Sequence, residues 1–124
     1  MSNEQKIIEK LKFSLIRLSA EFKISKQDIR LKLVKTGGKL KLFLMNRDTV
    51  VNEQGIKSAF NLSLLETPVV LAYLFKMMNR FISENRTDQV AFVVSAKNNE
   101  CEPRLDLFVS GIHKKELDKS EILN

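Results

Sequence analysis

The stretch Thr67–Glu84, TPVVLAYLFKMMNRFISE, decides the fold, because its pattern predicts a helix with apolar residues around most of its circumference. Thr67 is a favoured N-cap residue, and Pro68 suits the first helical position, where a backbone N–H lacks a partner in any case. Polar side chains gather on one narrow side, at Lys76, Asn79, Arg80 and Ser83. A helix of this pattern is buried, so we expect it at the centre of the core, with other elements packed on at least two of its faces. Its charged residues interrupt the apolar run well short of the roughly 20 residues that a membrane span needs.

Length and composition predict one domain. The chain has 124 residues, of which 44% are hydrophobic and 29% charged, values that suit a globular domain with a core of its own. We see no internal repeat and no Pro-, Gly- or Ser-rich linker. We therefore expect a single compact domain over residues 1–124, with residues 113–124 frayed. The N-terminus lacks the continuous apolar segment of a secretory signal, and Cys101 is the single cysteine, so we expect a cytoplasmic protein.

The first half of the chain changes its period from helix to strand. An amphipathic helix is predicted from Ser2 to about Phe22, because apolar residues recur there at helical spacing, at Ile8, Leu11, Leu15, Leu18 and Phe22. From residue 29 to residue 47, leucines alternate with other residues on both sides of Gly37-Gly38, a pair suited to a two-residue hairpin turn. With the glycines as the loop, the leucines share one face, and the expected cross-strand pairs are Leu33 with Leu42 and Leu31 with Leu44.

The second half of the chain predicts a second hairpin. Thr49–Leu65 is expected to connect the first hairpin to the long helix, and residues 90–96 and 105–109 alternate as strands. Placing Val94 opposite Leu107 puts both apolar sets on one face and leaves Val93 and Phe108 as a cross-strand pair on the other. Residues 113–123 predict a short final helix with Leu117 and Ile122 inward. A lone hairpin is marginal in water, so we expect an α+β fold: both hairpins in one antiparallel sheet, packed on the N-terminal amphipathic helix and the buried central helix.

An alternative interpretation of residues 18–35 is a helix-turn-helix. Leu18, Phe22, Ile24 and Ile29 occupy the packing positions of that family, and the stretch resembles it over this short length only. The resemblance implies a recognition helix that opens at Ser25, with Gly37-Gly38 in a following wing. Two residues depart from the family's pattern: Lys23 stands at the turn position that favours glycine, and Lys32 stands where the recognition helix is apolar.

The residues that catalysis requires are scarce, so we expect a protein that is not an enzyme. His113 is the single histidine and lies in the predicted tail, and Cys101 is flanked by Glu100 and Glu102, whose charges disfavour a thiolate. No set of His, Cys and carboxylate residues has the spacing of metal ligands, and no phosphate-binding loop or dinucleotide motif is present. We therefore predict no cofactor and no metal.

The formal net charge of +6 is concentrated in the first hairpin. Residues 29–47 carry basic side chains and no Asp or Glu, whereas the rest of the chain holds equal numbers of each sign. The predicted register collects a basic set with one aromatic on the face opposite the leucines: Arg30, Lys32, Lys39, Lys41, Phe43 and Arg47. Such cations can also serve only to keep a strand edge soluble. Because phosphates favour a cation cluster and an aromatic stacks on an unpaired base, we predict that this face binds RNA, DNA or a nucleoprotein.

A second hypothesis is a protein-binding adaptor or inhibitor. The order of helices and hairpins is similar to that of secretion chaperones, and inhibitors encoded by mobile elements form a comparable class. The basic face would then contact an acidic protein partner, and the pair Val93 and Phe108 would form a protein interface, for example in a homodimer. Pull-down from a lysate, with and without nuclease, distinguishes the two hypotheses.

Overall fold

The computed structural model describes residues 3–51, 56, 67–95 and 103–117. Its elements are listed here in chain order: α1 (Asn3–Glu21), β1 (Ile29–Thr36), β2 (Lys39–Asn46), β3 (Thr49–Val50), α3 (Thr67–Glu84), β4 (Gln89–Ser95), β5 (Arg104–Val109) and β6 (Ile112–Glu116). The strands form one six-stranded antiparallel sheet in the order β3-β2-β1-β4-β5-β6. The expected α+β fold, with two hairpins in one sheet and two helices packed on it, is confirmed.

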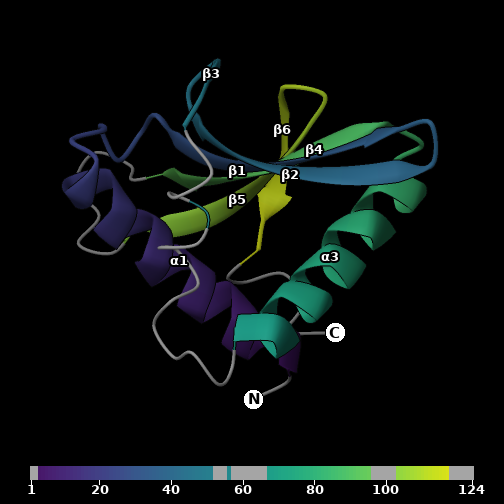
Figure 1. Ribbon diagram of the computed structural model, residues 1–124, viewed down its shortest axis with the longest axis horizontal. Coiled ribbons are helices and arrows are strands. Elements are labelled where there is room, and N and C mark those ends of the chain that lie inside the picture. The colour runs from purple at the N-terminus through teal and green to yellow at the C-terminus, as the bar shows by residue number, and fades with distance from the viewer. Residues whose placement is uncertain (1–2, 52–55, 57–66, 96–102, 118–124) are drawn as a thin grey trace.

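The fold has two layers, with both helices on the same face of the sheet (Figure 1). The core lies between the layers and combines aliphatic residues of α1, of α3 and of the inner face of four strands. Its fully buried side chains include Leu11, Leu15, Leu31, Leu44 and Phe92. The turns after β2 and after β5 project on the other side, away from the helices (Figure 1). That second face of the sheet, which we call the open face, is not covered by either helix.

The first hairpin has the predicted register. Leu33 pairs with Leu42 and Leu31 pairs with Leu44. Gly37 and Gly38 have φ values of 56° and 80°, the left-handed region that a two-residue hairpin turn of type I′ requires. Because residues 29–36 form this strand, the helix-turn-helix interpretation is wrong: the predicted recognition helix is β1, in the interior of the sheet.

Helix α3 has the predicted bounds, but its buried residues cover one wide side rather than most of the circumference. Leu74, Met78 and Phe81 are at most 2% exposed, whereas Tyr73 is 38% exposed and Lys76 is exposed as well. The helix contacts both α1 and the sheet, so two of its neighbours are as expected. The buried arc is one-sided because all of the sheet lies on one side of both helices (Figure 1).

The second hairpin keeps the predicted faces but not the predicted pairing. Val94 lies opposite Leu105, and Phe92 lies opposite Leu107. The expected pairing of Val94 with Leu107 is thus displaced by two residues, which leaves each side chain on its expected face. Val93 consequently pairs with Asp106 and not with Phe108. Residues 96–102, which connect the two strands, lie outside the described part of the chain.

The chain after β5 is a strand and not the predicted helix. Ser110 (φ 49°) and Gly111 (φ 83°) make a tight turn, and β6 returns along β5. A register shift between Leu107 and Phe108 interrupts the alternation of β6, which is why the pattern of residues 112–117 does not resemble a strand. Leu117 is 2% exposed and lies inward as expected. Residues 113–116 therefore belong to this strand, whereas Ile122 lies outside the described part of the chain.

The two halves of the molecule repeat the same structure, although no repeat is visible in the sequence. Within the described residues, each half contains a helix followed by three antiparallel strands. Helix α1 ends at Lys23 (φ 56°), and the next backbone N–H donates to the Ser19 carbonyl oxygen at 2.7 Å. Helix α3 ends in the same way at Arg86 (φ 50°), where the next N–H donates to the Ile82 carbonyl oxygen at 3.1 Å. Both ends thus have the Schellman hydrogen bond around a left-handed residue.

The strands repeat as well, about an approximate twofold axis. Where β2 turns into β3, the Arg47 N–H donates to the Asp28 carbonyl oxygen at 2.8 Å, and where β5 turns into β6, the Ser110 N–H donates to the Gln89 carbonyl oxygen at 3.3 Å. Arg47 therefore corresponds to Ser110, and Asp28 to Gln89. Leu31 lies three residues after Asp28, and Phe92 lies three residues after Gln89, so Leu31 and Phe92 are equivalent positions. Leu31 and Phe92 form a cross-strand pair of β1 and β4. The axis passes through the sheet at this pair.

The first prediction concerns the turn between β1 and β2. A Cβ atom at Gly38 would meet no atom within 4 Å, so the cost of a side chain there comes from the backbone alone. We expect Gly38→Ala to lower the free energy of unfolding by about 1 kcal/mol and Gly38→Asn to lower it less, because asparagine tolerates positive φ. Urea titrations of both variants measure this order, and an alanine variant as stable as the parent would contradict the turn.

The second prediction concerns the core side of α3. Leu74 is 0% exposed, so Leu74→Ala should lower the free energy of unfolding by about 2–5 kcal/mol. Lys76→Ala, on the exposed side of the same helix, should change it by less than about 0.5 kcal/mol. Thermal or denaturant melts of the two variants make the comparison, and similar losses in both would rule out this orientation of α3.

Candidate nucleic-acid interface

The open face carries the predicted basic side chains in rows that cross the strands. One row runs from Phe43 through Lys32 and Ala91 to Phe108, each residue paired with the next on the neighbouring strand. The row beside it runs through Met45, Arg30, Val93 and Asp106. Pairing of β1 with β4 therefore joins cations of the first hairpin to apolar and aromatic residues of the second.

A groove of about 320 Å³ lies on this face between the two projecting turns. Its first wall comes from the first half of the molecule and includes Arg30, Lys32, Met45, Arg47 and Asp48. Its second wall comes from the other half and includes Gln89, Ala91, Phe108, Ser110 and Gly111. The walls correspond under the twofold axis, since Arg47 is equivalent to Ser110 and Met45 to Phe108. Equivalent backbones thus present a basic wall on one side and a neutral, partly aromatic wall on the other.

Arg30 lies at the centre of the groove lining. It stands between Met45 and Val93 across the sheet, two residues that are 7% and 4% exposed. Its Nε is buried and has no hydrogen-bond partner among the described residues. Its guanidinium carbon lies 5.9 Å from the centroid of the Phe108 ring, within the range of a cation–π contact. A buried guanidinium donor without a partner is a position where a ligand acceptor gains a hydrogen bond.

The structure brings three of the predicted basic residues to the groove and leaves the other predicted residues beside it. Arg30, Lys32 and Arg47 line the groove. Arg47 is 71% exposed and its Nε donates to Asp28 Oδ1 at 2.7 Å, which holds the side chain at the groove's end. Lys39, Lys41 and Phe43 follow on β2, on the same face by alternation but outside the groove lining.

The second half contributes lining residues that the sequence did not indicate as nucleic-acid contacts. Gln89 and Ser110 bring an amide and a hydroxyl to the groove, and Asp48, from the first half, adds a carboxylate that the sequence also did not indicate. Phe108 is half-buried there, whereas it was expected at a protein interface. No local pattern marks these residues, because only the pairing of β1 with β4 places them beside the cations. The Ser110-Gly111 dipeptide, a residue pair typical of turns, is a sequence signal that could have located this turn.

The expectation that Val93 and Phe108 form an exposed pair is wrong. Val93 is 4% exposed and pairs with Asp106, and Phe108 pairs with Ala91. The physical reason is the two-residue displacement of the β4–β5 register, together with the flanking Arg30, which lies beside Val93 on β1. Val93 therefore offers little surface to a protein partner.

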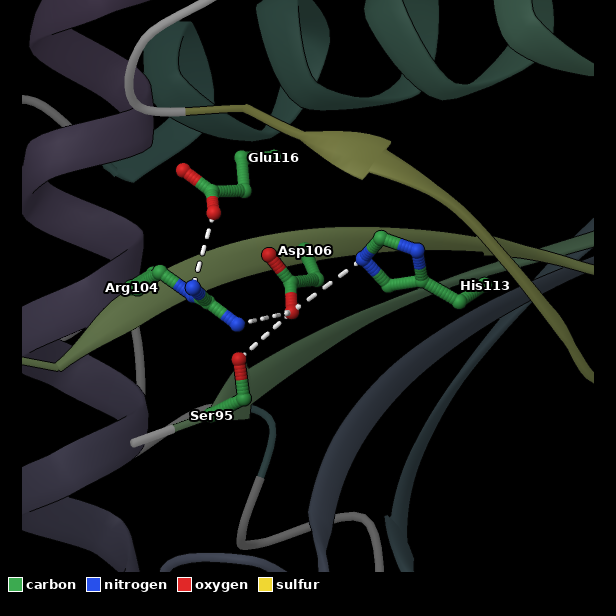
Figure 2. Close-up of polar contacts among 5 residues, drawn as sticks. All are labelled: Ser95, Arg104, Asp106, His113 and Glu116. Atoms are coloured by element: carbon green, nitrogen blue, oxygen red, sulfur yellow. Dashed lines mark hydrogen bonds and ion pairs between the residues drawn. The ribbon is translucent and has the colours of Figure 1, made fainter. Parts of the chain in front are cut away.

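A polar cluster of Ser95, Arg104, Asp106, His113 and Glu116 lies on strands β4, β5 and β6 (Figure 2). Asp106 is 2% exposed; its Oδ2 accepts a hydrogen bond from Ser95 Oγ and lies 3.4 Å from His113 Nε2 and 3.8 Å from Arg104 Nη2. Arg104 also forms an ion pair of 2.8 Å with Glu116. The register shift in β6 brings His113 and Glu116 to the same face as Asp106. The cluster thereby ties β4, β5 and β6 together on the open face.

The cluster reaches the groove through two rings. His113 lies edge-on to Phe108, with ring centroids 5.5 Å apart and an interplanar angle of 87°. On one side of the Phe108 ring lies the His113 imidazole, which contacts the Asp106 carboxylate. The ring also lines the groove. The position of the Phe108 ring therefore depends on His113, which in turn contacts the buried carboxylate of Asp106.

Comparisons of the chain with protein-family models, with curated proteins and with solved structures found no match. Within the described part of the chain, no helix has the length and apolar character needed to cross a membrane. The function must therefore be argued from the site itself.

A third prediction tests the polar cluster. Asp106→Ala removes the acceptor of Ser95 and the carboxylate beside Arg104 and His113, so it should lower the free energy of unfolding by about 1–3 kcal/mol. The backbone amides of β6 should also exchange with solvent faster. Asp88→Ala, at an exposed carboxylate, is the control and should have little effect on either quantity. Unchanged exchange in β6 after Asp106→Ala would refute its role in holding this strand.

Proposed function

We propose that the protein is a non-enzymatic nucleic-acid-binding protein and that its open sheet face contacts the phosphate backbone of RNA or DNA. The observation that carries the proposal is the convergence of Arg30, Lys32 and Arg47 on one groove of that face. Lys41 extends the same basic surface along β2. Phosphate oxygens favour such a cluster because each contact releases condensed counterions.

Protection of a strand edge does not account for Arg30 and Lys32. That role belongs to edge strands, whereas β1 lies between β2 and β4 in the interior of the sheet. Arg30 and Lys32 on β1 are half-buried, and a cation on a half-covered surface costs more free energy than one in open solvent. A ligand of opposite charge compensates that cost. The position of the basic residues therefore favours binding over solubility.

The geometry of the polar residues also supports a binding role over catalysis. The Asp106 carboxylate contacts both the Ser95 hydroxyl and the His113 imidazole. A serine nucleophile needs an imidazole base next to its hydroxyl, but the carboxylate occupies that position beside Ser95. The cluster stabilises strands and does not present a nucleophile to the groove. This arrangement favours a protein that binds without chemical change to its ligand.

A fourth prediction tests the proposal with variants of equal charge. Lys32, Lys41 and Arg47 are changed together to Gln, and a matched control changes Lys6, Arg17 and Lys76, which are exposed on the helices across the molecule. We expect the parent protein to bind a labelled oligonucleotide with an affinity that falls steeply as salt rises. The open-face variant should bind at least tenfold more weakly and lose roughly one unit of the logarithmic salt slope for each phosphate contact removed.

The control variant should keep most of the affinity, because its net charge changes equally but its open face is intact. Fluorescence anisotropy at several salt concentrations gives both quantities, and circular dichroism checks the fold. Equal losses in the two variants would mean attraction to net charge alone. If the parent protein binds no nucleic acid at low salt, the proposal fails, and an acidic protein partner becomes the better hypothesis for this face.

A further inference from the structure

We infer that the groove takes one unpaired nucleotide of a single strand, with its base stacked on Arg30 and Phe108 and its phosphate on the basic wall. This inference rests on the proposed function and narrows its ligand from nucleic acid in general to an unpaired base. It also assigns a role to Phe108 and to Asp48.

The distribution of charge across the groove is the first argument. Arg30, Lys32 and Arg47 stand on one wall, whereas the lining residues of the other wall, Gln89, Ala91, Phe108, Ser110 and Gly111, carry no charge. A strand that lies along the groove therefore finds phosphate contacts on one side only. The neutral side fits the base, whose faces and edges are uncharged.

A stacking surface is present on that neutral side. The Phe108 ring is half-buried, is held edge-on by His113 and lies near the Arg30 guanidinium. Unpaired bases stack on aromatic rings and on guanidinium planes, and the two occur together here. The groove volume of about 320 Å³ lies at the lower end of the range for small-ligand sites, which suits one nucleotide.

Asp48 is the second argument for a base in the groove. A carboxylate repels phosphate, so a site for phosphate alone has no use for Asp48 in its lining. The same carboxylate accepts hydrogen bonds from an exocyclic amino group of a base, as acidic residues do at cytosine N4. The amide of Gln89 and the hydroxyl of Ser110 add further partners for base edges. We therefore expect a preference for bases with an amino group over thymine or uracil.

The test compares labelled strands of about eight nucleotides, within the usual footprint of single-strand binding folds. The probes are oligo-dC, oligo-dT, a duplex of equal length and an abasic strand that keeps every phosphate. We expect the parent protein to bind oligo-dC at least fivefold more tightly than the abasic strand and the duplex, measured by anisotropy at one fixed salt concentration. Oligo-dT should bind more weakly than oligo-dC.

Two variants assign the effects to residues. Phe108→Leu should lower the affinity for oligo-dC at least fivefold and leave the affinity for the abasic strand unchanged. Phe13→Leu, at an exposed phenylalanine of helix α1, is the matched control. Asp48→Asn should tighten binding of oligo-dT, because a repulsive charge is removed, and should reduce the preference for oligo-dC. Circular dichroism establishes that each variant is folded.

The outcomes separate this inference from the proposed function. If the abasic strand or the duplex binds the parent protein as tightly as oligo-dC, the base does not enter the groove and the inference is overturned, while the backbone-binding function stands. If none of the probes binds at low salt, both fail. The probe comparison uses the unmodified protein, so an unfolded Phe108 variant does not weaken the test.

Discussion

The pairing of β1 with β4 is the interaction on which the rest of the structure depends. It joins two units of one helix and three strands into a single sheet, and its register is fixed at the pair Leu31 and Phe92, both 0% exposed. A slip by one residue would turn the apolar side chains of one unit away from the helices, so burial of the core locks the register. The same register decides that Arg30 lies beside Val93 and Lys32 beside Ala91. Packing of the core thereby determines which side chains are neighbours on the opposite, solvent-facing side of the sheet.

The two units share a backbone arrangement but differ in their side chains, and this difference gives the groove one basic wall and one uncharged wall. Helix ends, strand order and the tight turns after β2 and β5 correspond between the units. These features follow from local hydrogen bonding and tolerate many sequences. The side chains at equivalent groove positions differ: Met45 corresponds to Phe108 and Arg47 to Ser110. The fold itself does not require this asymmetry, because both versions of each position are accommodated by the same backbone.

The sequence predicted the elements whose determinants are local and missed those that depend on long-range pairing. Two glycines in a two-residue loop allow a single register, so the first hairpin was predicted residue by residue, and the bounds of α3 followed from its pattern. Val94 can pair with either Leu105 or Leu107 while its side chain stays on the same face of the sheet. Alternation alone therefore could not determine the register, and the predicted pairing with Leu107 was wrong. Strand β6 was missed because its register shift breaks the alternation. Arg30, Lys32 and Arg47 could be grouped from the sequence because they lie on one hairpin, whereas the position of Gln89 and Phe108 beside them requires the sheet order.

The combination of a twofold backbone with one-sided charge constrains the ligand further. A ligand with its own twofold symmetry, such as a palindromic duplex, would need cations on both walls of a groove that lies on the axis. Here only the wall of the first unit carries them, together with the carboxylate of Asp48. The groove is therefore directional: its two ends and its two walls differ. The single strand that we propose as the ligand is directional in the same sense, because its phosphates run along one side and its bases along the other.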